Sequence, residues 1–397
     1  MRVLIFSTSY YPMVGGAEVA VKEITDRIPD IQFDLICAKQ KDLPDVEKIG
    51  NVTVYRIGFG MGMLDKLSVP FRGAVKAWQL NKKHEYDAFW AIMATYASGA
   101  GYITNILRRL SGKKKIPMIL TLQEGDSEGH LKYRWGGLID LSWRLALART
   151  DTLTAISNYL LARARKLGFK STSELIPNGV DMELFNSPIS EAVLEEARKQ
   201  SQKRPGDFYL ITTSRLNVKN AISDVIDALK FLPSHIKFLI LGVGELEEDL
   251  KRQAKRLGIE DRVIFLGFIE HRDLPKYLKI SDIFIRPSLS EGMGNSFIEA
   301  MAAGLPVIAT PVGGIPDFLF DPDANPDKLP TGLFVPVKSP KLIAFQIQKL
   351  MNDRVLHDKI VINARRMVQE KYDWNLIARD MKGRVFLSPL SSISDLA

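Results

Sequence analysis

The sequence of 397 residues contains one cysteine, Cys37, and only 5 histidines. A single cysteine cannot form an internal disulfide, so the fold does not depend on one, as is typical of proteins in a reducing cytoplasm. No uninterrupted apolar run approaches the roughly 20 residues that a membrane-spanning helix needs. The first apolar run, Val3–Phe6, is too short for a signal-peptide core and is expected to form a buried strand. We therefore expect a cytoplasmic protein.

The length and the charge balance indicate the number of domains and the kind of partner. A chain of 397 residues exceeds one compact core, so two domains are expected. The formal net charge of +8 is uneven, because the segment 65–170 holds 18 Lys and Arg against 8 Asp and Glu. This excess predicts contact with an anionic partner such as the inner face of a membrane, although a solubilising surface is the simpler alternative. No nucleic-acid-binding module accompanies the charge, so nucleic acid is not an expected partner.

Short apolar runs alternate with helical stretches in two series. The first series of expected strands is Val3–Phe6, Phe33–Cys37, Val52–Ile57, Ala88–Met93, Met118–Leu122, Thr152–Ala155 and Glu174–Ile176. The second is Phe208–Thr212, Lys237–Leu241, Val263–Leu266, Ile283–Ile285 and Val307–Ala309. Such alternation predicts an α/β fold of two doubly wound parallel sheets, with ligands at the carboxyl ends of the strands. We expect domains at 1–185, completed by a C-terminal helix at 372–397, and at 186–371.

The stretch from Pro287 to Pro311 carries the strongest functional signal. It consists of a glycine-broken loop and an Ala/Met-rich helical segment between two apolar strands. The unpaired N–H groups at the start of such a helix favour phosphate or hydroxyl oxygens. Glu291 in the loop and Glu299 in the helix are carboxylates that sugar and ribose hydroxyls could satisfy. An ordinary βαβ unit with solvated acids is the alternative interpretation of this stretch alone.

Other loops at strand ends have residues suited to a nucleotide. Arg215 and Lys219 follow the first strand of the second domain, where they could hold a diphosphate without a metal. Gly242 and Gly244 predict a close backbone turn beside a nucleotide, and Gly267 with Phe268 could hold a base. In the first domain, Gly15–Gly16 lies between a strand and a helix and would let a ligand approach the backbone closely.

The segment Met61–Trp78 is basic and amphipathic, since large apolar residues alternate with lysine and arginine. A segment of this kind can rest on a membrane surface or bind an apolar acceptor. A stripe of core residues is the alternative.

Taken in order, these motifs resemble those of the retaining glycosyltransferases of family four, which have the GT-B fold. The similar segments span nearly the whole chain and are Tyr10–Glu18, Ile176–Asp181, Ser214–Asn220, Asp261–Ile269, Ser281–Ser288, Glu291–Glu299 and Pro306–Asp317. The resemblance implies transfer of a sugar from a GDP- or UDP-sugar to a lipid-linked or glycan acceptor, in cell-envelope or exopolysaccharide synthesis. It also implies retention of the anomeric configuration, no metal, and no cofactor beyond the nucleotide-sugar itself.

The resemblance also implies roles for individual residues. Glu291 would bind hydroxyls of the donor sugar, and Glu299 would hold the ribose. Arg215 and Lys219 would neutralise the departing diphosphate, and Gly16 would approach the same phosphates from the first domain. The backbone around the remaining predicted site residues would line the sugar and diphosphate; these residues are Gly292, Met293, Gly294 and Asn295.

Two positions depart from the family pattern. Gln123 follows the strand Met118–Leu122, where many relatives place a histidine, and it can bind a sugar hydroxyl but cannot titrate. His130 is expected to be structural, whereas Glu124 or Asp126 could orient the acceptor. Met293 replaces a common aromatic residue, which bears on sugar preference.

Two other functions share this fold. A nucleotide-sugar epimerase would have the same two domains, and a catalytically silent sugar-nucleotide-binding protein would fit the loss of histidine at Gln123. A nicotinamide dehydrogenase is disfavoured, because the N-terminus lacks Gly-x-Gly-x-x-Gly and a downstream ribose-binding acid.

Overall fold

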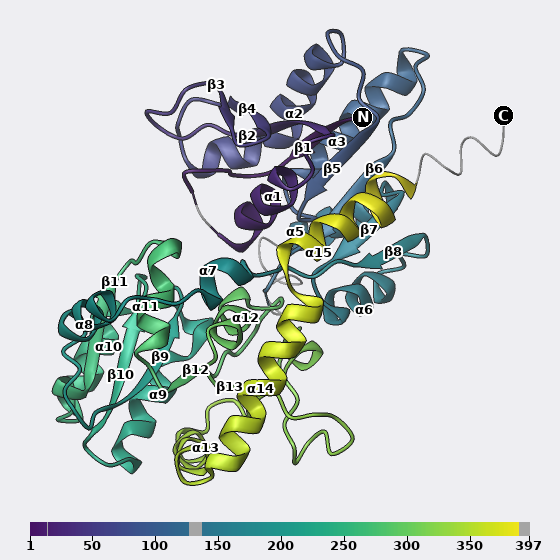
Figure 1. The fold of residues 1–397 in the computed structure, drawn as a ribbon. Helices are drawn as coiled ribbons and strands as arrows, with labels where there is room; N and C mark the ends of the chain where they lie inside the picture. The colour runs from purple at the N-terminus through teal and green to yellow at the C-terminus, as the bar shows by residue number, and fades with distance from the viewer. Residues whose placement is uncertain (14, 127–136, 389–397) are drawn as a thin grey trace. The chain divides into compact units, whose positions relative to one another are not determined.

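The computed structural model describes residues 1–13, 15–126 and 137–388, which form two compact α/β units (Figure 1). The first unit comprises Met1–Asn178 and the chain from Trp374 onward, and the second comprises Gly179–Asp373. The division therefore falls seven residues before the predicted boundary at 185, and the chain returns to the first unit at residue 374 rather than 372.

An eight-stranded sheet forms the centre of the first unit, in the order β3-β4-β2-β1-β5-β6-β7-β8. Its strands are β1 (Arg2–Phe6), β2 (Gln32–Ala38), β3 (Val46–Ile49), β4 (Val52–Ile57), β5 (Ala88–Ile92), β6 (Met118–Leu122), β7 (Thr152–Ala155) and β8 (Thr172–Leu175). The helical segments are α1 (Gly16–Asp26), α2 (Met63–Leu80), α3 (Ser98–Leu110), α5 (Leu138–Ala148), α6 (Asn158–Lys166), α15 (Trp374–Asp380) and the π-helical η7 (Met381–Phe386).

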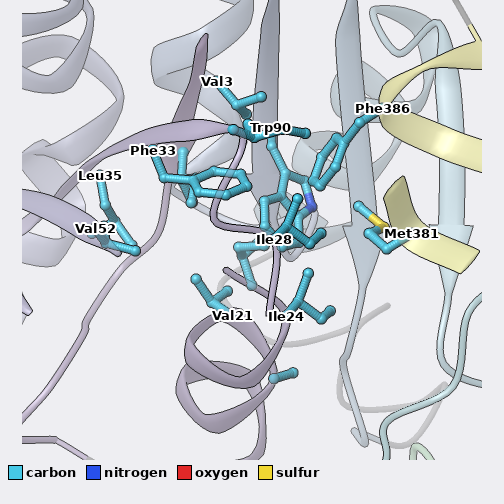
Figure 2. Close-up of a cluster of buried hydrophobic side chains, with 14 of the residues drawn as sticks. Val3, Val21, Ile24, Ile28, Phe33, Leu35, Val52, Trp90, Met381 and Phe386 are labelled. Carbon is cyan, nitrogen blue, oxygen red and sulfur yellow. The ribbon is translucent and has the colours of Figure 1, made fainter. Parts of the chain in front are cut away.

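Helices cover both faces of this sheet, because successive strand residues point to opposite sides. On one face, Val3 and Trp90 pack with residues of α1 and of the C-terminal segment (Figure 2). On the other face, Leu4 and Phe89 pack with residues of α2 and α3. Figure 1 shows the yellow helix α15 beside the purple helix α1, although more than 340 residues separate them in sequence. The end of the chain thus completes the core of the first unit.

A six-stranded sheet forms the second unit, in the order β11-β10-β9-β12-β13-β14. Its strands are β9 (Phe208–Thr213), β10 (Ile236–Leu241), β11 (Val263–Gly267), β12 (Ile283–Arg286), β13 (Val307–Ala309) and β14 (Leu333–Phe334). The α-helices are α7 (Met182–Asn186), α8 (Glu191–Gln200), α9 (Ile222–Ala228), α10 (Glu247–Arg256), α11 (Leu274–Lys279), α12 (Asn295–Ala302), α13 (Pro340–Asn352) and α14 (Arg354–Lys371). Short 3₁₀ turns are η2 (Val218–Asn220), η3 (Leu229–Phe231), η4 (Glu260–Arg262), η5 (His271–Asp273) and η6 (Ile315–Asp317).

Each sheet has one point at which the strand order reverses. In the first sheet this switch point lies between β1 and β5, and in the second between β9 and β12. Loops leave the carboxyl ends of the two switch-point strands in opposite directions, which opens a crevice where ligands of doubly wound folds bind. The topology therefore predicts that the ligand-binding loops are those after β1, β5, β9 and β12.

The predicted fold class, two doubly wound and mostly parallel α/β sheets, is confirmed. Two strands were missed: β3, which pairs antiparallel with β4 at the edge of the first sheet, and the two-residue β14. β3 is half polar and exposed on alternate residues, so it lacks the continuous apolar run that marks a buried parallel strand. Within the described residues, no helix is both long and apolar enough to cross a membrane.

The C-terminal segment supplies a testable part of the first core. The ring of Phe386 is fully buried and meets Trp90 edge-on at 5.2 Å and Phe33 at 5.9 Å. We predict that Phe386→Ala lowers the free energy of unfolding of the first unit by about 3–5 kcal/mol, because it leaves a cavity. Urea-induced unfolding, followed by fluorescence, measures the free energy of unfolding of each variant. Leu387→Ala, at a half-exposed neighbour, should cost less than ~1 kcal/mol, and equal losses for the two variants would contradict the packing described.

Candidate active site

Two loops meet at the switch point of the second sheet. β9 and β12 are neighbours there, so the loops that leave their carboxyl ends begin side by side. The loop after β9 contains Arg215 and Lys219, and the loop after β12 contains Glu291. The backbone N–H of Leu289 donates a hydrogen bond of 2.7 Å to the carbonyl of Lys219. The structure thus brings these predicted site segments together.

The two cations of the β9 loop are available to an anion. Arg215 is exposed and Lys219 half-buried. The side chain of Asn220 donates to the carbonyl oxygen of Arg215 at 2.7 Å, which closes the turn around η2. Among the residues that the structure describes, neither cation forms an ion pair with a carboxylate. Uncompensated positive charge at a strand end suits a phosphate, which guanidinium can grip at two points.

The turn Gly242–Gly244 after β10 packs directly on the backbone of the β9 loop. Gly242 has φ +140°, and a Cβ there would lie 1.9 Å from the carbonyl oxygen of Ser214. A Cβ at Gly244 would lie 2.3 Å from the carbonyl oxygen of Leu216. Packing within the protein thus requires glycine at both positions, since only glycine permits this approach of two chain segments. Their predicted contact with a nucleotide stays a prediction.

The carboxylate of Glu291 has a fixed partner on each oxygen. Oε2 accepts a hydrogen bond from Nη2 of Arg286 at 2.9 Å, and Oε1 accepts one from the backbone N–H of Gly292 at 3.1 Å. Gly313, with φ +57°, packs on the backbone of Glu291, because a Cβ there would lie 1.7 Å from the Glu291 carbonyl oxygen. Sequence reasoning missed Arg286, although a charged residue at the end of the apolar run Ile283–Ile285 was a usable signal.

The start of α12 lies directly after this loop. Gly294 has φ +91° and precedes the helix, which begins at Asn295, so the N–H groups of the first turn are directed toward this loop. Met293 is 1% exposed, so its side chain belongs to the interior and only its backbone can line a ligand site. An influence of Met293 on sugar preference would therefore act through the packing of the loop. The predicted lining of sugar and diphosphate by this backbone stays a prediction.

Glu299, on the same helix, pairs with a residue that the sequence did not single out. Nε2 of His271 lies 2.9 Å from Oε1 of Glu299, and the His271 ring meets Phe185 at 5.3 Å between centroids. The side chain of Glu299 is mostly buried, whereas that of His271 is partly exposed. His271 therefore orients the carboxylate that the sequence assigns to the ribose.

The turn after β11 has the features expected of a base-binding surface. Gly267 has φ +69°, and among the described residues nothing other than its chain neighbours lies within 4 Å of the position that its Cβ would take. The next residue, Phe268, is 67% exposed. An accessible aromatic ring beside an open turn can pack on a planar base.

In the first unit, the predicted glycines lie at the β1 side of the switch point. Gly15 is the N-cap of α1, and the exposed Gly16 is the first residue of that helix. Glu18 in the first turn is buried and accepts a hydrogen bond of 2.6 Å from Ser9. Glycines add no side chain of their own at the start of α1, and a helix N-terminus suits an anionic group. The predicted contact of these glycines with phosphates stays a prediction.

Gln123 and Glu124 follow β6, one strand further along. The Oε1 atom of Gln123 accepts a hydrogen bond of 3.1 Å from the side chain of Asn178, which fixes the amide. Glu124 is buried, and its two oxygens accept from the backbone N–H groups of Ala94 at 2.5 Å and of Gln123 at 3.0 Å. Burial raises the pKa of Glu124 to about 7, although these donors partly offset the effect. His130 lies outside the described residues.

Two doubly wound α/β units with glycine-rich loops at their switch points define the GT-B class of glycosyltransferases. HepE of Anabaena, solved in complex with UDP-glucose, has a similar structure. Its TM-score is 0.77 at 22% sequence identity, over 99% of this chain and all of that one. At that level of identity the likeness shows the fold.

Sequence comparison gives the family. Residues 14–184 match the model of glycosyltransferase family 4, and residues 193–367 match that of glycosyl transferases group 1. An uncharacterized glycosyltransferase of Methanocaldococcus jannaschii is 31% identical over 96% of this chain and 96% of its own length. Alpha-monoglucosyldiacylglycerol synthase of Streptococcus pneumoniae is 28% identical over 78% of this chain and 71% of its own. The chain belongs to the group 1 family of glycosyltransferases.

The buried Glu124 carboxyl predicts a pH-dependent stability. Its pKa rises from 4.5 in the unfolded chain to about 7 in the fold, so the unfolded chain ionises first. Below pH 4.5 the carboxyl is protonated in both the folded and the unfolded chain, and the free energy of unfolding is highest. As the pH rises from 4.5 to about 7, ionisation in the unfolded chain lowers the free energy of unfolding by about 3 kcal/mol. Glu124→Gln should remove this slope from the pH dependence of urea unfolding, whereas Asp126→Asn should keep it. A slope that survives Glu124→Gln would assign it to another group.

Proposed function

We propose that this glycosyltransferase transfers a hexose from a GDP- or UDP-sugar to a lipid-linked or glycan acceptor, with retention, in cell-envelope or exopolysaccharide synthesis. One observation carries the proposal. Arg215 and Lys219, which pair with no carboxylate among the described residues, lie on a loop that is hydrogen-bonded, through Leu289, to the loop of Glu291. The complex of HepE with UDP-glucose and the glycolipid product named in the Streptococcus pneumoniae relative support the donor and the acceptor class.

The chemistry follows from where charge develops. Breaking the bond between sugar and phosphate builds positive charge on the anomeric carbon and negative charge on the departing diphosphate. Arg215 and Lys219 would stabilise the diphosphate, together with the N–H groups at the start of α12. Glu291 would bind sugar hydroxyls, and Glu299, oriented by His271, would bind the ribose. Preplaced charges of this kind need no reorganisation during the reaction, which is why they accelerate it.

The remaining steps require little from the protein. The leaving phosphate would itself accept the proton of the acceptor hydroxyl, so the proposal assigns no dedicated base. The same cations would replace a metal in neutralising the diphosphate. In the first unit, Gly15 and Gly16 would present the N-terminus of α1 to the phosphates, and Gln123 would hydrogen-bond a sugar hydroxyl.

We predict that Arg215→Ala and Lys219→Ala each lower kcat about a hundredfold, or ~3 kcal/mol in transition-state stabilisation. A thermal-shift panel of GDP- and UDP-sugars first identifies the donor, because a ligand that binds the native state stabilises it. Release of nucleoside diphosphate is then measured with lipid and glycan acceptors in the presence of EDTA. Arg252→Ala is the matched control, since Arg252 is an exposed arginine on α10 of the same unit.

Other outcomes of this assay identify the alternatives. Conversion of one nucleotide-sugar into another without diphosphate release would indicate the epimerase. Tight binding with no turnover on any acceptor would indicate the silent binding protein. Turnover that EDTA abolishes and a divalent cation restores would contradict the metal-independent mechanism.

We further propose that the acceptor is met at an anionic membrane surface, through an exposed apolar stripe on α2. The α2 stripe is defined as Met63, Leu64, Leu67, Phe71 and Val75, preceded by exposed Phe59 and Met61. The opposite side of α2 is buried and includes small residues that pack closely on α3; for example, a Cβ at Gly73 would lie 2.8 Å from Cβ of Ala100. The large apolar side chains are thus on the outer side, where the core does not use them.

Basic residues border this stripe, which favours a lipid surface over another apolar partner. The guanidinium of Arg72 lies 4.3 Å from the ring centre of Phe59, and Nζ of Lys113 lies 5.3 Å from that of Trp78. Nζ of Lys76 lies 4.9 Å from the ring centre of Tyr55. Apolar side chains flanked by aromatic rings and cations are typical of segments that lie in the interface of an anionic bilayer.

We predict that the wild-type protein sediments with vesicles of phosphatidylglycerol and phosphatidylcholine. The double variant Leu64→Ser/Phe71→Ser should bind them at least about tenfold more weakly, since it removes two large apolar side chains from the interface. Val355→Ser/Ile362→Ser removes two exposed apolar residues of α14 and should bind like the wild type. Equal sedimentation of all three proteins, or none by the wild type, would contradict the membrane proposal.

A further inference from the structure

Arg286 is a charged residue in the interior of the second unit. It ends β12, and only 5% of its surface is exposed. A buried guanidinium costs several kcal/mol unless hydrogen bonds and an opposite charge compensate it. Here the compensation comes from Glu291, whose Oε2 lies 2.9 Å from Nη2, and from two serine hydroxyls. Nε donates to Oγ of Ser288 at 3.2 Å, and Nη1 donates to Oγ of Ser296 at 2.7 Å.

The loop after β12 and the start of α12 wrap around this guanidinium. The ring of Phe297 covers it at 4.3 Å from Cζ to the ring centre. Gly294 makes room for it, because a Cβ at that position would lie 2.9 Å from Nη2. Nη1 also donates to the carbonyl oxygen of Thr213, the last residue of β9, at 3.4 Å. One side chain therefore links the ends of β9 and β12 with the first turn of α12.

The consequence for Glu291 is a fixed carboxylate. Arg286 occupies one lone pair of Oε2, and the Gly292 N–H occupies one of Oε1. Each carboxylate oxygen can accept a further hydrogen bond, and the side chain of Glu291 keeps 14% of its surface exposed. The remaining acceptor positions thus have a direction set by the protein, as recognition of a sugar hydroxyl requires.

We propose that Arg286 is a positioning residue that orients Glu291 toward the hydroxyls of the donor sugar. This inference rests on the proposed function, in which Glu291 contacts the sugar. Stability alone does not require the charge, because a well-packed apolar side chain in place of a buried ion pair is often equally stable or more so. Of the groups that Arg286 contacts, Glu291 is the carboxylate of this loop, so the effect of Arg286 on the donor sugar would pass through Glu291.

The test distinguishes recognition of the donor sugar from binding of the nucleotide. Arg286→Met should bind UDP and GDP, which lack the sugar, within about twofold of the wild type, while kcat/KM for the donor nucleotide-sugar falls about tenfold or more. Arg286→Lys keeps the positive charge but not the planar set of guanidinium donors, so its kcat/KM should lie between those of Arg286→Met and the wild type. Ser296→Ala removes one anchor of the guanidinium and keeps the ion pair, so a smaller loss of kcat/KM is expected even if Arg286→Met does not fold.

A double-variant cycle shows whether Arg286 acts through Glu291. The combination Arg286→Met/Glu291→Gln should have the same kcat/KM as Glu291→Gln alone, because a positioning residue has no effect once its partner is changed. A multiplied loss in the double variant, or an equal loss of UDP and nucleotide-sugar binding in Arg286→Met, would overturn the inference and leave the proposed function intact. A wild type that neither binds nor turns over any nucleotide-sugar would instead overturn the proposed function, and this inference with it.

Discussion

Close contact between the backbones of neighbouring loops is the constraint on which the candidate donor site depends. The turn after β10 lies against the loop after β9 at Gly242, and Gly313 lies against the backbone of Glu291. In both places a Cβ would lie less than 2 Å from a carbonyl oxygen, so only glycine fits. These contacts fix the height of each loop above the sheet. The positions of Arg215 and Glu291 therefore follow from the glycines as much as from their own strands.

The charges of this region divide into two kinds with different tasks. Arg286 is buried and paired with Glu291, so little of its side chain is accessible to a ligand. Arg215 is exposed, Lys219 is half-buried, and within the described chain neither pairs with a carboxylate. A phosphate that binds these two cations removes little existing interaction, and so keeps most of the electrostatic gain. In the proposed site, the buried cation would supply geometry and the accessible cations would supply affinity.

Sequence patterns predicted the fold well because its strands are buried on both faces and read as continuous apolar runs. They also found the loops that meet at the β9/β12 switch point, since loop, glycine and charge are local features. They missed Arg286 and His271, whose partners Glu291 and Glu299 were predicted for the ligand instead. Both pairings depend on how loops stack in three dimensions. Local patterns show which residues are polar, but not which polar groups satisfy one another.

Glu124 in the first unit and Arg286 in the second show that the two sheets meet the same requirement in the same way. Both are buried ionisable residues at the carboxyl side of the sheet: Glu124 follows β6, the neighbour of the switch-point strand β5, and Arg286 ends the switch-point strand β12. Glu124 ties the N–H of Ala94, in the loop after β5, to its own loop after β6. Met93, directly before Ala94, has φ +69°, a conformation that costs free energy and persists only where its surroundings hold it. A buried carboxyl that accepts hydrogen bonds from two loops can hold such a conformation, because leaving those buried N–H groups without a partner would itself cost free energy.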